Sequence, residues 1–202
     1  LEFLKTLTET IIDSSRIYPG ERVADQMGNN NTGGILVKPG GRGSYPAFWI
    51  RDYAMSLESG FISREEQRHM LLLTASTQAD RTWITKNGAL IPYGDQFFFV
   101  HMAFYFIKTT SELTILEQKI NGTSLMDRLE IAFNVPPSRL EDHIVTTTDH
   151  FRGIDFGFRD VMTITGDLCY PSILKFKAAL ELSELFEKLN NQQKADKYQL
   201  IA

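Results

Sequence analysis

Hydrophobic residues recur at helical spacing along most of the chain. Near the start, Leu4, Leu7 and Ile11 fall on one face of a helix predicted over residues 1–12, and we expect that face to cover a core. The turn-forming triplet Tyr18-Pro19-Gly20 ends this segment.

The same spacing predicts two helix hairpins in the middle of the chain. The first joins a helix over 48–59, ended by Gly60, to a helix that a Ser63/Glu66 capping box opens and that runs to about Gln78. The second hairpin has its outer half split, and its helices are predicted over 95–108, 113–120 and 125–133.

A third helix pair is predicted at the C-terminal end. Its first helix starts at Tyr170 or Pro171, because proline suits the first helical turn, and runs toward Asn190-Asn191. The apolar positions of this helix are Ile173, Phe176, Leu180, Leu185 and Leu189. A last helix follows the Asn pair.

Long polar connections separate these helices. Residues 28–44 are rich in Gly and Asn around one apolar piece, 35–37, which predicts a short strand or small hairpin in an ordered flap, with a flexible linker as the alternative. Residues 142–168 form a mixed loop. No strand-rich block and no βα alternation occurs, so we predict one all-α domain of antiparallel helix hairpins over residues 1–202.

Composition excludes two classes of partner. With 43% hydrophobic residues in 202, the chain can bury a core, but its net charge of -4 and scattered Lys and Arg provide no basic stripe for nucleic acid. No segment approaches the roughly 18 consecutive apolar residues that span a bilayer. We therefore expect no nucleic-acid partner and no membrane partner.

Thiol and imidazole chemistry is not indicated either. The single cysteine, Cys169, stands at the start of an apolar helix and is predicted to be a buried packing residue. The four histidines lack the spacing of a helical metal site, so we expect no metal and no cofactor. His101, inside an apolar helix, is predicted to be a hydrogen-bonded core histidine.

Three acidic residues, Asp52, Asp95 and Asp160, stand at or near the starts of the apolar helices. Capping and compensation of the helix dipole, worth about 0.3–2 kcal/mol each, would explain any one of them. Each acid, however, lies among aromatic residues: Phe48, Trp49 and Tyr53; then Tyr93 and Phe97; then Phe156 and Phe158. Aromatic rings stack on the apolar face of a sugar while charged groups bind its hydroxyls, so the pattern favours a sugar-binding cleft.

Three segments resemble motifs of the six-hairpin glycosidases, whose (α/α)6 toroid is shared by glucoamylases, trehalases and processing α-glucosidase-like enzymes. Phe48-Trp49-Ile50-Arg51-Asp52 is similar to the Trp-x-Arg-Asp segment that grips the sugar at the cleavage subsite. The segment 94–100 resembles an Asp-Asn/Gln stretch that opens a later inner helix, and the segment 156–160 resembles the region around the catalytic acid.

The resemblance implies roles for individual residues. Asp160 would be the general acid, with Asp155 as the alternative, because Phe158-Arg159 stands where many members have Gly-Trp before the acid. The implied substrate-binding residues are Trp49, Arg51, Asp52, Tyr93, Asp95, Gln96, Phe158 and Arg159. The implied partner is an oligosaccharide or glycoside.

An inverting glycosidase also needs a second carboxylate, roughly 6.5–9.5 Å from the acid, to activate water. No loop after Asp160 offers one, and a twelve-helix ring needs a longer chain. We therefore expect the N-terminal half of a catalytic toroid, with three alternatives: a sugar-binding member without activity, a toroid completed by another chain, or a helical repeat scaffold that binds protein. Polysaccharide breakdown would favour an exported protein over a cytoplasmic one.

Overall fold

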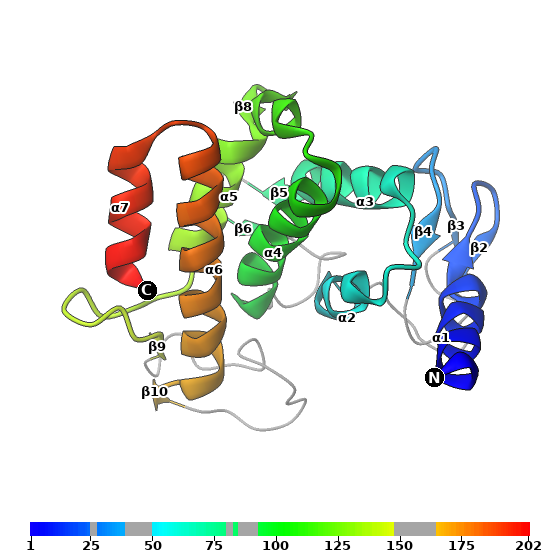
Figure 1. The fold of residues 1–202 in the computed structure, drawn as a ribbon, viewed down its shortest axis with the longest axis horizontal. Helices are drawn as coiled ribbons and strands as arrows, with labels where there is room; N and C mark the ends of the chain where they lie inside the picture. Colours follow the sequence, from blue (N-terminus) through cyan, green and yellow to red (C-terminus); the bar gives the residue numbers. More distant parts are fainter. Residues whose placement is uncertain (25–27, 39–49, 80–82, 85–92, 148–164) are drawn as a thin grey trace. The chain divides into compact units, whose positions relative to one another are not determined.

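The computed structural model describes residues 1–24, 28–38, 50–79, 83–84, 93–147 and 165–202 (Figure 1). Its described parts contain seven α-helices, and the strands in them are only two or three residues long, so the helical class is confirmed. The chain divides into two compact units, Leu1–Thr74 and Ala75–Ala202. The single domain stays a prediction.

The first unit begins with α1 (Glu2–Ser14) and two short antiparallel strand pairs. β1 (Arg16–Ile17) pairs with β4 (Leu36–Val37), and β2 (Arg22–Ala24) pairs with β3 (Gly28–Asn29). The strand predicted at 35–37 is therefore confirmed. Its partner strand, β1, directly follows α1. Ile17 of β1 and Val37 of β4 are both buried.

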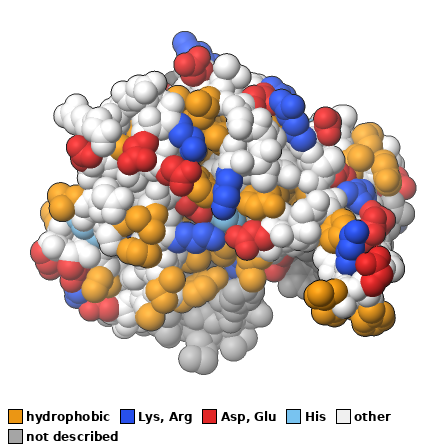
Figure 2. Space-filling model, in the orientation of Figure 1, with side chains coloured by type: hydrophobic (Ala, Val, Ile, Leu, Met, Phe, Trp, Pro, Cys, Tyr) orange, Lys and Arg blue, Asp and Glu red, His pale blue; other side chains and the backbone are white. Residues whose placement is uncertain are grey.

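The apolar face of α1 does not cover the core of this unit, contrary to our expectation. Leu4, Leu7 and Ile11 are 58%, 44% and 50% exposed, whereas Ile12 is 4% exposed. Figure 2 shows hydrophobic side chains gathered on the surface over this helix. Buried side chains at the end of α1 and in β1 and β4 contribute to the core instead.

The rest of the first unit is helical. α2 (Ile50–Ser56) leads into a 3-10 turn (Leu57–Ser59), and Gly60 ends the segment with a left-handed φ of 76°. α3 (Arg64–Ser76) follows. The predicted capping box is confirmed: the Ser63 backbone N–H donates to the Glu66 carboxylate at 2.8 Å, and the Glu66 N–H donates to Ser63 Oγ at 3.3 Å.

The described residues of the second unit form four α-helices with short strand pairs between them. They are β5 (Gln78–Ala79), β6 (Trp83–Ile84), α4 (Tyr93–Thr110), a 3-10 turn (Leu113–Glu117), β7 (Lys119–Ile120), β8 (Thr123–Ser124), α5 (Leu125–Asn134), β9 (Thr146–Thr147), β10 (Gly166–Asp167), α6 (Cys169–Lys188) and α7 (Gln192–Ile201). The strands pair antiparallel as β5 with β6, β7 with β8 and β9 with β10.

The helix predicted over 113–120 is wrong beyond Glu117. The chain forms a tight hairpin, in which Asn121 and Gly122 adopt φ values of 50° and 82°. Asn-Gly is the preferred pair for such a two-residue turn, because both positions need positive φ. The preference of Asn-Gly for a tight turn therefore outweighs the helical spacing of apolar residues after Glu117.

Four aromatic rings hold the helices of the second unit together. Phe133 of α5 meets Phe97 of α4 edge to face at 6.0 Å between ring centroids, and Tyr198 of α7 at 5.2 Å. Tyr198 in turn stacks on Phe186 of α6 at 5.6 Å. α6 and α7 lie side by side as a hairpin (Figure 1).

α6 buries only part of the predicted apolar pattern: Leu185 is 0% exposed. Ile173, Phe176 and Leu180 are 58%, 49% and 37% exposed. Cys169 is also exposed, so its predicted burial is wrong. The buried stripe is Pro171, Lys175, Ala178, Ala179, Leu182, Leu185 and Phe186. Its two alanines are small, which lets neighbouring helices approach closely.

We predict that the charge of Glu66 stabilises the first unit. The Glu66 side chain is 5% exposed and pairs with Arg16, whose Nη2 donates to Oε2 at 3.1 Å. Burial alone would raise the pKa of Glu66, but hydrogen bonds from Arg16 and Ser63 outweigh burial and lower it. Glu66→Gln keeps a capping side chain and removes the charge, so it should lower the free energy of unfolding by about 2 kcal/mol at pH 7.

The pH dependence gives the check. Because the folded pKa lies below the unfolded value, the stabilisation is present above the unfolded pKa and is lost as pH falls through the folded one. Urea unfolding from pH 7 down to pH 3 should show this loss in the wild type and a smaller one in Glu66→Gln. Glu9→Gln, an exposed residue on α1, is the control. Equal pH profiles for wild type and Glu66→Gln would contradict the prediction.

Candidate functional site

Several of the predicted site residues lie outside the described part of the chain. These are Trp49, Asp155, Phe158, Arg159 and Asp160. Tyr93 begins α4, but its side chain also lies outside the description. The remaining four residues form two pairs, each at the start of a helix.

Arg51 and Asp52 occupy the first turn of α2 in the first unit and are both partly exposed. The Asp52 backbone carbonyl accepts a hydrogen bond from Ser56 Oγ at 2.8 Å. Its Oδ2 atom is buried and has no hydrogen-bond partner among the described residues. A buried carboxylate oxygen without a partner is costly, so the position of Asp52 calls for an explanation.

The residue that follows this pair, Tyr53, holds the start of α2 in position. Tyr53 is fully buried, and burial, with the charge of Glu66 as a second cause, raises the pKa of its hydroxyl. The ring therefore stays neutral and fixes the rotation of α2. Consequently Arg51 and Asp52 are held on the side of the helix that is partly open to solvent.

Asp95 and Gln96 lie in the first turn of α4 in the second unit, and they are 2% and 0% exposed. A carboxylate at a helix start is stabilised by the helix dipole. Neither side chain is open to solvent. Asp95 and Gln96 therefore differ from Arg51 and Asp52 in solvent exposure, although the sequence places all four residues at helix starts.

The N-terminal part of α4, residues 94–103, is buried on all sides. Phe97, Phe98, Phe99 and Val100 are consecutive and each is at most 8% exposed. Farther along, His101 Nδ1 donates to the Glu181 carboxylate of α6 at 2.6 Å, with both side chains nearly buried. The predicted hydrogen-bonded core histidine is thus confirmed, and the pair joins α4 to α6.

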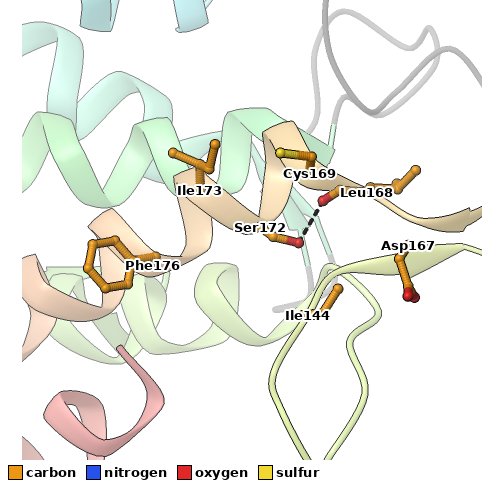
Figure 3. A pocket seen from close by; sticks show the side chains of 7 residues that line it. All are labelled: Ile144, Asp167, Leu168, Cys169, Ser172, Ile173 and Phe176. Carbon is orange, nitrogen blue, oxygen red and sulfur yellow. Dashed lines mark hydrogen bonds between the residues drawn. The ribbon is translucent and has the colours of Figure 1, made fainter.

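A cavity of about 460 Å³ opens beside the start of α6 (Figure 3). Its walls are apolar, and its polar atoms are already used. Ser172 Oγ donates to the Leu168 carbonyl at 2.6 Å and accepts from the Val145 N–H at 3.0 Å, while Asp167 accepts from Arg139 at 2.7 Å. The exposed thiol of Cys169 also lines the cavity, which contains none of the predicted site residues.

A second cavity, of about 450 Å³, lies in the first unit and is more polar. It is lined by Thr32, Glu65, Arg68, His69, Leu72 and Leu73. Sequence analysis missed it, because Thr32 and His69 are far apart in the chain and only folding brings them together. His69 Nε2 lies 3.0 Å from Thr32 Oγ1.

Lys175 was also missed by the sequence analysis. It is 8% exposed on α6, and its ammonium lies 5.5 Å from the centroid of the Phe133 ring. Burial lowers the pKa of Lys175 to about 8. Its burial places it in the core stripe of α6, which the sequence did not distinguish from the exposed stripe.

The described ranges contain neither a cluster of metal ligands nor a helix that could span a membrane. In those ranges no three His, Cys, Asp or Glu side chains are grouped as metal ligands. In the same ranges no helix has both the length and the apolar character to cross a bilayer.

We predict that the bond from His101 to Glu181 stabilises the second unit. Glu181→Ala leaves a buried imidazole N–H without its acceptor, which should cost about 1–3 kcal/mol of unfolding free energy. Glu184→Ala, on the same helix, is the matched control: Glu184 is 47% exposed and pairs with Lys188 at 3.3 Å. It should change stability by at most about 0.5 kcal/mol. Equal destabilisation by the two substitutions in chemical unfolding would refute the prediction.

Comparison with known proteins does not extend this description. No protein-family model matches the chain, and no curated protein matches it in sequence.

Proposed function

We propose that this chain is part of the catalytic domain of an inverting glycoside hydrolase with an (α/α)6 toroid. The observation that carries the proposal is the segment Trp49-Ile50-Arg51-Asp52, which resembles a sugar-gripping motif. Arg51 and Asp52 begin α2, are partly open to solvent, and leave a buried carboxylate oxygen without a described partner. A partly exposed carboxylate and a partly exposed guanidinium in the same helix turn suit the hydroxyls of a sugar.

The character of α4 and α6 supports a double ring of helices. A helix that is buried on all sides is surrounded by protein, as an inner helix of a toroid would be, and residues 94–103 of α4 have this character. α6 carries one buried apolar stripe and a second, exposed stripe of Ile173, Phe176 and Leu180. In the proposal, further helices of the toroid cover the exposed stripe.

The proposed chemistry follows from two carboxyl groups. Asp160, or Asp155 in its place, protonates the departing glycosidic oxygen, while a carboxylate from the rest of the toroid removes a proton from the attacking water. Trp49 stacks on the sugar ring, and Arg51 and Asp52 hold its hydroxyls. Asp95 and Gln96 are buried, so in this proposal they hold the start of α4 in position.

A non-catalytic sugar-binding protein of the same fold is the second candidate. It is favoured by the absence of any residue in the sequence that we can assign as the base. Both candidates require sugar binding by Arg51 and Asp52. They differ only in turnover, so one set of variants distinguishes them.

We predict that the native full-length protein hydrolyses at least one member of a panel of α-glucosides, α-mannosides and rhamnosides with inversion, as read by NMR of the first-formed anomer. Asp160→Asn should reduce turnover by about 10²–10⁴-fold, because it removes the general acid. Asp52→Asn should instead weaken sugar binding. Asp142→Asn, a surface acid paired with Arg139, is the control and should leave both unchanged.

The outcomes separate the candidates. Binding without hydrolysis in the wild type, abolished by Asp52→Asn, would select the sugar-binding protein. Retention of configuration, or loss of activity in Asp155→Asn with Asp160→Asn unaffected, would overturn the assignment of the acid or the mechanism. A protein that neither binds nor cleaves any sugar would overturn the proposal and favour a helical scaffold.

A further inference from the structure

Two asparagines of the chain stand in the acceptor sequence for N-linked glycosylation, Asn-x-Thr, and the structure distinguishes them. They are Asn30, with Thr32 two residues later, and Asn121, with Thr123 two residues later. A glycan is bulky and solubilising, so the asparagine that carries one must lie on the surface of the folded protein. Its amide nitrogen must also be available for reaction.

The acceptor sequence at Asn30 is closed in the folded first unit. Asn30 is 2% exposed, and its Nδ2 group donates both of its hydrogens, to the carbonyls of Ile17 and Gly34 at 2.9 and 2.8 Å. The hydroxyl and the backbone N–H of Thr32 donate to Asn30 Oδ1, at 2.7 and 3.1 Å. A glycan on Asn30 would break this buried network, so it is incompatible with the folded first unit.

The acceptor sequence at Asn121 is open. Asn121 and Gly122 form the turn of the β7–β8 hairpin and are both exposed, and Thr123, the first residue of β8, is partly exposed. Among the described residues, neither the Asn121 amide nor the Thr123 hydroxyl has a hydrogen-bond partner. Both groups that the acceptor sequence requires are therefore accessible for recognition and reaction.

A glycan at Asn121 leaves the contacts of the hairpin intact. The hairpin is held by the pairing of Ile120 with Thr123 and by Arg128, whose Nε donates to the Ile120 carbonyl at 3.1 Å. These contacts use backbone atoms of the hairpin, and the Asn121 side chain takes part in none of them. Modification of this side chain is therefore compatible with the folded second unit.

We propose that Asn121 is an N-glycosylation site that receives an oligosaccharide from a lipid pyrophosphate carrier. The Asn121 nitrogen forms a bond to C1 of the first sugar and releases a proton. The bond between C1 and the pyrophosphate oxygen breaks, and the lipid pyrophosphate departs with the electron pair of that bond. The proposal requires passage through a secretory compartment that holds such a carrier, and it does not require glycosidase activity.

The test expresses the full-length protein behind a secretory signal sequence in a eukaryotic cell. The secreted, folded protein is treated with peptide-N-glycosidase in H₂¹⁸O, which converts a glycosylated asparagine into an ¹⁸O-labelled aspartate, and its peptides are analysed by mass spectrometry. We expect the label at Asn121 and none at Asn30. A sample kept in the same water without the enzyme corrects for spontaneous deamidation at Asn121-Gly122.

Variants of the acceptor sequence separate recognition from structure. Asn121→Gln and Thr123→Val should each abolish the glycan, whereas Thr123→Ser keeps the hydroxyl and should retain it. Asn134→Gln changes an exposed asparagine outside an acceptor sequence and is the control. Circular dichroism establishes that each variant is folded.

Three results would overturn the proposal: an unlabelled Asn121 in the wild type, a labelled Asn30 in the folded protein, or a glycan that survives Thr123→Val. If the protein is retained inside the cell, the label is read at Asn121 in the retained protein, and its absence there equally contradicts the proposal.

Discussion

The contact between Phe133 and its aromatic neighbours is the constraint on which the second unit depends. Phe133 lies on α5, yet its ring meets Phe97 of α4 and Tyr198 of α7, and Tyr198 continues the cluster to Phe186 of α6. Four helices are thus joined through one set of ring contacts. Such rings bury large apolar areas and prefer edge-to-face or offset stacking, so the cluster sets both the spacing and the angle of the helices.

Polar contacts around this cluster specify the arrangement further. The Tyr198 hydroxyl donates to Glu130 at 3.0 Å, and Lys194 binds the same carboxylate at 2.5 Å. Arg128, 2% exposed, donates to Gln78 Oε1 at 2.8 Å and to the Ile120 carbonyl. Because buried polar groups are costly unless they are paired, each of these bonds excludes alternative helix positions.

The sequence predicted those elements whose signals are local. The capping box at Ser63 and Glu66 involves neighbours on one helix turn, and Gly60 ends its segment through its own φ angle, so both could be predicted without tertiary information. Helices over 95–108 and 125–133 were likewise found nearly at their observed bounds. By contrast, the two stripes of α6 are both apolar, and only the aromatic cluster decides which one is buried.

The candidate sites divide in the same way. That an acid stands at a helix start can be predicted from the sequence, but whether it is buried cannot. Asp52 and Asp95 have the same local signal, an acid in the first turn beside aromatic residues. Asp95 is nevertheless 2% exposed while Asp52 is partly open to solvent. The difference comes from the start of α4, where residues 94–103 are all buried.

A similar argument separates His101 from His69. His101 lies in an apolar helix, so its burial and its need for an acceptor could be expected, although Glu181, 80 residues away, could not be named. His69 lies on a polar helix, which predicts an ordinary surface residue. Its environment is set by Asn30 and Thr32, which reach it only because β1 pairs with β4 and places the intervening loop beside α3. A site built by a loop that folds back on a distant helix has no periodic signal, so it becomes visible only when hydrogen-bond donors and acceptors are assigned atom by atom.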